Sequence, residues 1–148
     1  DVNFNEKLNI NSPEGLALAS VNVYRDVLSG EISIDEAFEM LKSYAAEDSL
    51  DGIIKNQDKF KRDMKQNIDY MIENGIKIEK VEFAKTIYSS SQKASIERIQ
   101  KLSNGRSYYF KQDFIYENGK WKIYGDNITD EFKIKWSLKH IFSRNYIV

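Results

Sequence analysis

The sequence contains no cysteine and a single proline. The absence of cysteine excludes disulfides, thiolate metal sites and a cysteine nucleophile. Seven glycines, 41% hydrophobic residues and 30% charged residues are typical of an ordered globular chain rather than a disordered one. We therefore predict that the 148 residues form a single domain around one core.

The sequence also lacks an excess of charge of one sign and any long apolar run. Its 22 basic and 23 acidic residues nearly cancel, so no net field attracts a polyanion and we expect no nucleic-acid partner. No apolar run approaches the ~20 residues that cross a bilayer, so we expect no membrane span. Because the first residue is Asp1 rather than methionine, one interpretation is that a leader, a lipid-anchor segment or a tag was removed, and the sequence alone leaves this open.

The N-terminal part of the chain carries helix signals after a short irregular segment. Residues 1–11 show no sustained period, and we interpret them as an arm. Ser12 followed by Pro13 predicts a helix start, because serine caps free amides and proline needs no donor in the first turn. Apolar residues then recur at helical spacing until Gly30, which predicts the end of this first helix.

Two further helices are predicted before residue 75. Ser33 and Glu36 have the spacing of a capping box, which opens a second helix reaching about residue 46. Residues 47–52 are interpreted as a break. A third helix is predicted over 54–74, since its apolar residues share one side.

After residue 75 the apolar period changes to two, which predicts strands. Ile76 and Ile78 alternate in one register, whereas Val81 and Phe83 alternate in the other. This shift predicts a bulge near residues 79–80, and a bulge bends a sheet.

The following strands are separated by hairpin signals. A strand is predicted over 93–102, and the Asn-Gly pairs at 104–105 and 118–119 predict turns, because both residue types tolerate positive φ. Between the turns, aromatic residues alternate along one face of a strand, and the strand 120–124 continues the meander.

The C-terminal segment 128–148 is predicted as a strand or helix extension. Residues 132–138 alternate as a strand would, and we favour a short helix or tail over 140–148. The predicted fold class is α+β, with N-terminal helices packed on a curved antiparallel sheet in a cone-like core over 12–127.

This order of elements, ending in the sequence YENGKWKIY at 116–124, resembles the nuclear transport factor 2-like superfamily. The Asn-Gly hairpin followed by Trp-Lys-Ile is similar to the closing strands of small bacterial cell-envelope lipoprotein domains of that superfamily. The resemblance implies a curved sheet that wraps a helix layer and leaves a cleft. It implies no single activity, because the superfamily includes isomerases, cyclases, dehydratases and assembly factors.

The candidate ligand residues lie on the aromatic strand. Gln112 sits among aromatic residues, which predicts either a polar patch in the cleft or a core hydrogen bond. Tyr116 on the same face is a second ligand-binding candidate. Asp113 on the other face is the one nameable catalytic candidate, and the alternative places it on the solvated convex side.

The candidate partner residues are Trp121, Tyr124 and Trp136, because aromatic side chains concentrate contact area. They predict a protein partner or a homodimer, and the same residues would equally serve a hairpin core. His140 is interpreted as a surface or packing residue, because no acid or nucleophile has matching spacing. The acidic residues do not follow calcium-loop spacing, so we expect no metal and no cofactor.

These patterns favour a non-enzymatic binding or assembly domain, bacterial and extracytoplasmic or associated with the cell envelope. It would contact a protein or a small apolar ligand through a sheet face or cleft. The alternative is a small cone-fold isomerase, cyclase or dehydratase with an acid in an apolar cleft. The enzyme hypothesis is the weaker one, since no acid/base pair is evident.

Overall fold

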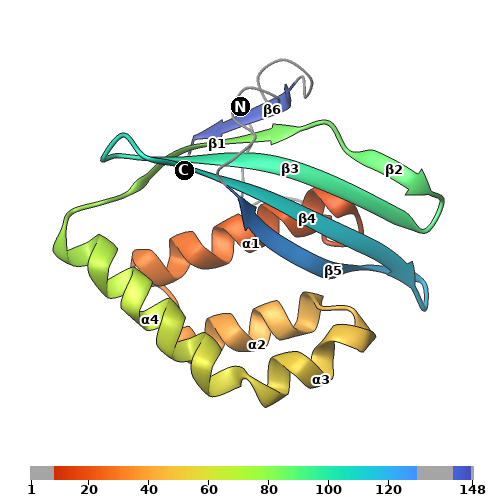
Figure 1. The fold of residues 1–148 in the computed structure, drawn as a ribbon, viewed down its shortest axis with the longest axis horizontal. Coiled ribbons are helices and arrows are strands. Elements are labelled where there is room, and N and C mark those ends of the chain that lie inside the picture. The colour runs from red at the N-terminus through yellow and green to blue at the C-terminus, as the bar shows by residue number, and fades with distance from the viewer. Residues whose placement is uncertain (1–8, 130–141, 148) are drawn as a thin grey trace.

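The fold is a layer of helices packed against one face of an antiparallel sheet (Figure 1). The computed structural model describes residues 9–129 and 142–147. The helices, in chain order, are α1 (Pro13–Leu28), α2 (Ile34–Tyr44), α3 (Glu47–Lys55) and α4 (Gln57–Glu73). The strands are β1 (Ile78–Ala84), β2 (Ile87–Ser90), β3 (Lys93–Leu102), β4 (Ser107–Glu117), β5 (Lys120–Thr129) and β6 (Phe142–Ile147).

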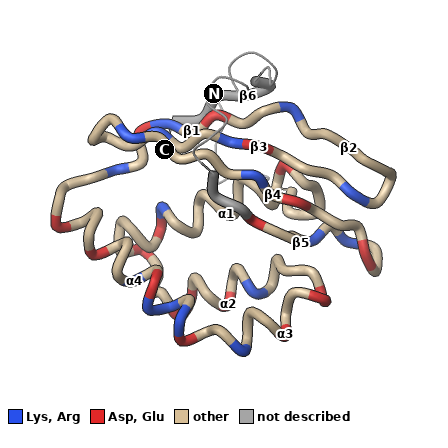
Figure 2. Tube along the Cα trace, viewed as in Figure 1, with Lys and Arg blue, Asp and Glu red and all other residues tan. Residues whose placement is uncertain are grey.

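The sheet order β5-β4-β3-β1-β6, with β2 paired to β3, is antiparallel throughout the described residues. The sheet is curved and open, and the predicted α+β class is confirmed. Helix α1 lies between the sheet and the other helices (Figure 1). Basic and acidic residues are mixed along the outer helices (Figure 2), where Lys59–Asp63 and Lys65–Asp69 form ion pairs of 2.6 Å.

The predicted starts of the first two helices are confirmed. The Ser12 hydroxyl accepts a hydrogen bond from the Gly15 amide, and proline occupies the first helical position. Ser33 and Glu36 form the full capping box, since each side chain accepts from the other residue's amide.

The predicted break at residues 47–52 is wrong, because these residues form most of α3. Glu47 and Asp48 in the first turn complement the helix dipole, and the Glu47 amide donates to the Glu117 carboxylate at 2.8 Å. This second contact comes from 70 residues away, so local patterns do not contain it. The predicted 54–74 helix is divided at Asn56, which ends α3 and precedes α4.

The predicted bulge and hairpins are present. The pairing of β1 with β3 shifts between Ile78 and Lys80. At the β4–β5 turn, Asn118 and Gly119 both have positive φ, 51° and 77°, as a two-residue hairpin requires. The β3–β4 connection is longer than two residues, because the last pair before it joins Lys101 to Ser107.

The short helix or tail predicted for residues 140–148 is wrong over the described part, which is strand β6. Strand β6 pairs with β1 from Lys80↔Ile147 to Ala84↔Phe142. The pairing satisfies backbone groups that would otherwise line a free edge of β1. The strand predicted over 132–138 lies outside the described residues.

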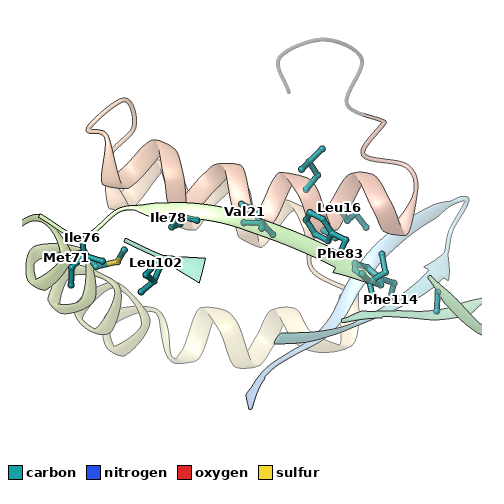
Figure 3. Packing of buried hydrophobic residues seen from close by; sticks show 13 residues of the cluster. Leu16, Val21, Met71, Ile76, Ile78, Phe83, Leu102 and Phe114 are labelled. Atoms are coloured by element: carbon teal, nitrogen blue, oxygen red, sulfur yellow. The ribbon is translucent and has the colours of Figure 1, made fainter. Parts of the chain in front are cut away.

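The apolar periodicity of the sequence predicts one core containing Phe38, Met64, Ile68, Phe83 and Phe110 or Phe114. Among the described residues, the buried hydrophobic side chains instead form two main clusters and a small third one of Ala84, Ile99 and Tyr109. Figure 3 shows the first cluster, in which side chains of α1 meet the sheet; it includes Leu16, Val21, Ile78, Phe83 and Phe114. The second joins the helices and includes Val23, Val27, Ala37, Met64 and Ile68. The clusters are separate because α1 buries opposite faces against different neighbours, and Leu28 and Tyr44 pack against both.

Over the part of the chain that the structure describes, none of the helices has the length and apolarity that crossing a bilayer demands.

We predict that Ile68→Ala lowers the free energy of unfolding by about 2 to 5 kcal/mol, because the side chain is buried and truncation leaves a cavity. The control is Ile72→Ala on the same helix, where the side chain is 57% exposed; it should change stability by less than about 0.5 kcal/mol. Chemical denaturation measures both. Equal effects of the two substitutions would contradict the position of Ile68 in the helix cluster.

Candidate functional site

A pocket of about 440 Å³ lies between the helices and the helix-facing side of the sheet. This volume is within the range of ~300–1,000 Å³ that holds small ligands in proteins. Most of the wall is aromatic or aliphatic, from Tyr24, Phe60, Tyr70, Met71, Ile76, Ile78, Leu102, Tyr108 and Phe110. The polar lining comes from Asn67, Arg98, Gln100, Asn104, Arg106 and Asp126.

Strand alternation directs the polar groups to the helix side. Along β3, Arg98 and Gln100 share a face with Ile96, which packs in the first core cluster. The register then places Phe110 opposite Arg98 and Gln112 opposite Ile96. The polar floor of the pocket is therefore a continuation of the buried face of the sheet.

Arg98 is the central polar group of the pocket and is only 3% exposed. Its Nε donates to the Gln100 Oε1 at 2.8 Å, and its Nη1 donates to the Gln112 Oε1 at 2.7 Å. The guanidinium carbon lies 4.3 Å from the centre of the Phe110 ring, a cation–π distance. Two amide oxygens and one ring thus hold the guanidinium in a fixed orientation.

Gln112 connects the guanidinium to the helix layer and to the neighbouring strand. Its side chain is 1% exposed. The Nε2 group donates to the Ser20 Oγ on α1 at 3.1 Å and to the Asp126 Oδ2 on β5 at 3.3 Å. Because the Ser20 hydroxyl donates to the Leu16 carbonyl, a continuous hydrogen-bonded chain runs from the sheet into α1.

The charges in the pocket influence one another. Burial lowers the pKa of the Arg98 guanidinium, and Asp126 and Tyr24 oppose that change. Asp126 retains solvent contact, yet the surrounding walls remove enough water to raise the pKa of its carboxyl, against the effects of Arg98 and Gln112. Burial also raises the pKa of the Tyr24 hydroxyl, with a further contribution from Asp126.

The predicted ligand and catalytic residues lie in different places. Gln112 lies beneath the pocket within its supporting network, where it makes the core hydrogen bonds of one sequence interpretation. Tyr116 lies outside the pocket lining and packs on Trp121, with ring centres 5.4 Å apart. Asp113 lies on the sheet face away from the helices, 4.0 Å from Lys111, and does not line the pocket.

Two of the predicted partner residues, Trp121 and Tyr124, lie on β5 and do not line the pocket. Trp121 is half-buried and contacts the rings of Tyr88 and Tyr116. Tyr124 is 54% exposed. Trp136, like His140, lies outside the described residues. Among those that are described, no group of three or more potential ligand side chains is arranged to hold a metal ion.

Sequence reasoning missed Arg98, Tyr24 and Asp126 as pocket residues. The alternation of β3 contained a signal for Arg98, because it shares a face with Ile96 and Leu102. Asp126 had no such signal, since the predicted strand ended at Tyr124, whereas β5 continues to Thr129.

No family model and no curated protein matches the chain. A solved structure described as the intermembrane space region of the chloroplast protein ARC6 is similar over 78% of this chain and 95% of that one. The two share 12% identity, with a TM-score of 0.42. A likeness this distant supports no functional argument.

We predict that Gln112→Leu destabilises the protein by about 1 to 3 kcal/mol, because it leaves one Arg98 N–H without its acceptor and removes the N–H that donates to the Ser20 oxygen. Leucine has a similar volume, so packing changes little. Lys111→Gln on the adjacent, exposed position serves as the control and should cost less than about 0.5 kcal/mol. Thermal or urea unfolding measures the stability of both variants. If Gln112→Leu leaves the free energy of unfolding unchanged, the network contributes nothing to stability.

Proposed function

We propose that this protein is a non-enzymatic binding domain that holds a small, largely apolar ligand between its helices and its sheet. The observation that carries the proposal is the pocket of about 440 Å³, which has aromatic walls and an oriented guanidinium at its base. A few fixed polar groups within an apolar enclosure are typical of small-ligand sites.

The pocket supports ligand binding more directly than the aromatic end of the sheet supports a protein partner. Part of the Trp121 side chain is already in contact with the rings of Tyr88 and Tyr116. The exposed side chains of Tyr88 and Tyr124 remain as a surface that a protein partner or a second copy of the chain could contact. We therefore also propose that these exposed tyrosines contact a protein partner or a second copy of the chain.

Kinship with the nuclear transport factor 2-like superfamily, and an extracytoplasmic or cell-envelope location in bacteria, are further parts of the proposal. The kinship is supported by the order of the elements and by a pocket between the helices and a curved antiparallel sheet. The location depends on the resemblance to envelope lipoprotein domains. Recovery of the full-length product only from the cytoplasm after cell fractionation would rule that location out.

One observation favours the enzyme alternative. Asp126 and Tyr24 line the same apolar pocket, and the partial loss of surrounding water raises the pKa of both groups, although Asp126 keeps contact with solvent. A carboxyl with a raised pKa beside a neutral hydroxyl is a pair suited to proton transfer at carbon. We rank this alternative second, because the Asp126 carboxylate already accepts a hydrogen bond from Gln112. Absence of deuterium incorporation from D2O into any bound carbonyl compound would count against it.

We predict that the neutral apolar dye N-phenyl-1-naphthylamine binds saturably, with one dye per chain. Asn67→Trp should weaken binding by about tenfold or more, because Asn67 is an exposed residue of α4 that lines the pocket and a tryptophan there fills its mouth. Dye fluorescence measures the affinity.

Gln66→Trp is the matched control, since Gln66 is an exposed neighbour that does not line the pocket. Its affinity should stay within about twofold of the natural protein. Absence of saturable binding, or equal losses in the two variants, would refute a ligand site in this pocket.

A further inference from the structure

The buried guanidinium of Arg98 has hydrogen-bonding capacity that the described protein does not use. Its Nε and one N–H of Nη1 donate to neutral amide oxygens of Gln100 and Gln112. The second N–H of Nη1 and those of Nη2 have no acceptor among the residues that the structure describes. Arg98 nevertheless lines the pocket, so these donors are available to a molecule inside it.

Among the residues that the structure describes, Arg98 also has no direct anionic partner. Within the described parts of the chain it forms no ion pair at 4.0 Å or less. The acid whose charge acts on it, Asp126, accepts a hydrogen bond from Gln112. Burying a cation without a paired anion is costly, and buried charges in proteins are generally paired. A bound anion would supply the missing partner.

The charge balance of the pocket indicates how much negative charge it accommodates. Among the described residues that line it, Arg98 and Arg106 are positive and Asp126 is negative, which gives +2 − 1 = +1. A monoanion neutralises this charge. A phosphate monoester, with a charge of about −1.5 to −2, would exceed it.

The shape of the guanidinium favours a carboxylate among monoanions. A carboxylate is planar and accepts two parallel N–H bonds from a guanidinium edge, a geometry that spherical anions lack. Phe110 stacks on the guanidinium and fixes its plane before any ligand arrives. The remaining wall is aromatic and aliphatic, which suits an apolar body attached to the acid.

We propose that the pocket binds an apolar acyl or aryl molecule with a single carboxylate, and that this carboxylate pairs with Arg98. The inference rests on the proposed function and specifies its ligand class. It assigns Arg98 as the group that recognises the acid, and the walls from α4 and β4 as the site of the apolar chain.

The test compares matched acids and amides, which differ in charge but hardly in shape. The probes are 4-phenylbutyrate with 4-phenylbutanamide, and octanoate with octanamide, titrated by calorimetry at pH 7.5. We expect each acid to bind at least about tenfold more tightly than its amide. Arg98→Gln should abolish this preference while leaving the affinity for the amides within about threefold.

A second variant keeps the test decisive if Arg98→Gln fails to fold. Asp126→Asn retains an oxygen that can accept from Gln112 and raises the net charge of the pocket to +2. It should strengthen binding of the acids by about threefold or more and leave the amides unchanged. Lys111→Gln removes a positive charge from the opposite face and should alter no ratio of acid to amide affinity.

The outcomes separate the two proposals. If amides bind as tightly as acids, or if Asp126→Asn does not favour the acids, the carboxylate inference is wrong while the apolar site stands. If neither the acids, the amides nor the neutral dye binds, the proposed function itself fails.

Discussion

The structure depends on how a permanently charged guanidinium is accommodated under the helix layer. Arg98 is buried and donates to the neutral amide oxygens of Gln100 and Gln112, which must therefore lie at fixed positions. Gln100 lies on the same strand, whereas Gln112 lies on the next, which makes the β3–β4 register a condition of the match. A slip of one residue would turn Lys111 or Asp113 inward, and neither could replace the amide.

The same amide determines where α1 can lie. Gln112 donates to Ser20, a buried residue of α1, so one side chain links the charge on β3 to the helix that separates the two hydrophobic clusters. Along α1, Val21 packs in the cluster against the sheet, whereas Val23 packs in the cluster between the helices. Aromatic residues of α4 and β4 form part of the pocket wall.

Local signals predicted much of this fold. Ser12, Pro13 and the Ser33 capping box gave the helix starts, and the change of register after Ile78 gave the bulge, because each is decided by neighbouring residues. Helix α3 was missed because Glu117 supports its start from another part of the chain. The candidate site was predicted less well. Gln112 was recognised as a polar residue among aromatic ones, but its partner Arg98 lies on another strand, and only the strand register shows that the two meet.

The link between Ser20 and Gln112 also matters for synthesis of the chain. The two residues are 92 positions apart, so α1 leaves the ribosome long before β4, the strand that carries Gln112. Until β1, β3 and β4 have emerged, the apolar residues on the sheet-facing side of α1 lack some or all of their native partners in the first cluster, and nascent chains with such exposed surface are prone to aggregate or to recruit chaperones. The helices α2 and α4 emerge earlier and cover the opposite side of α1. Assembly during translation would therefore proceed from the helix layer to the sheet, with the guanidinium buried only after the β3–β4 hairpin closes.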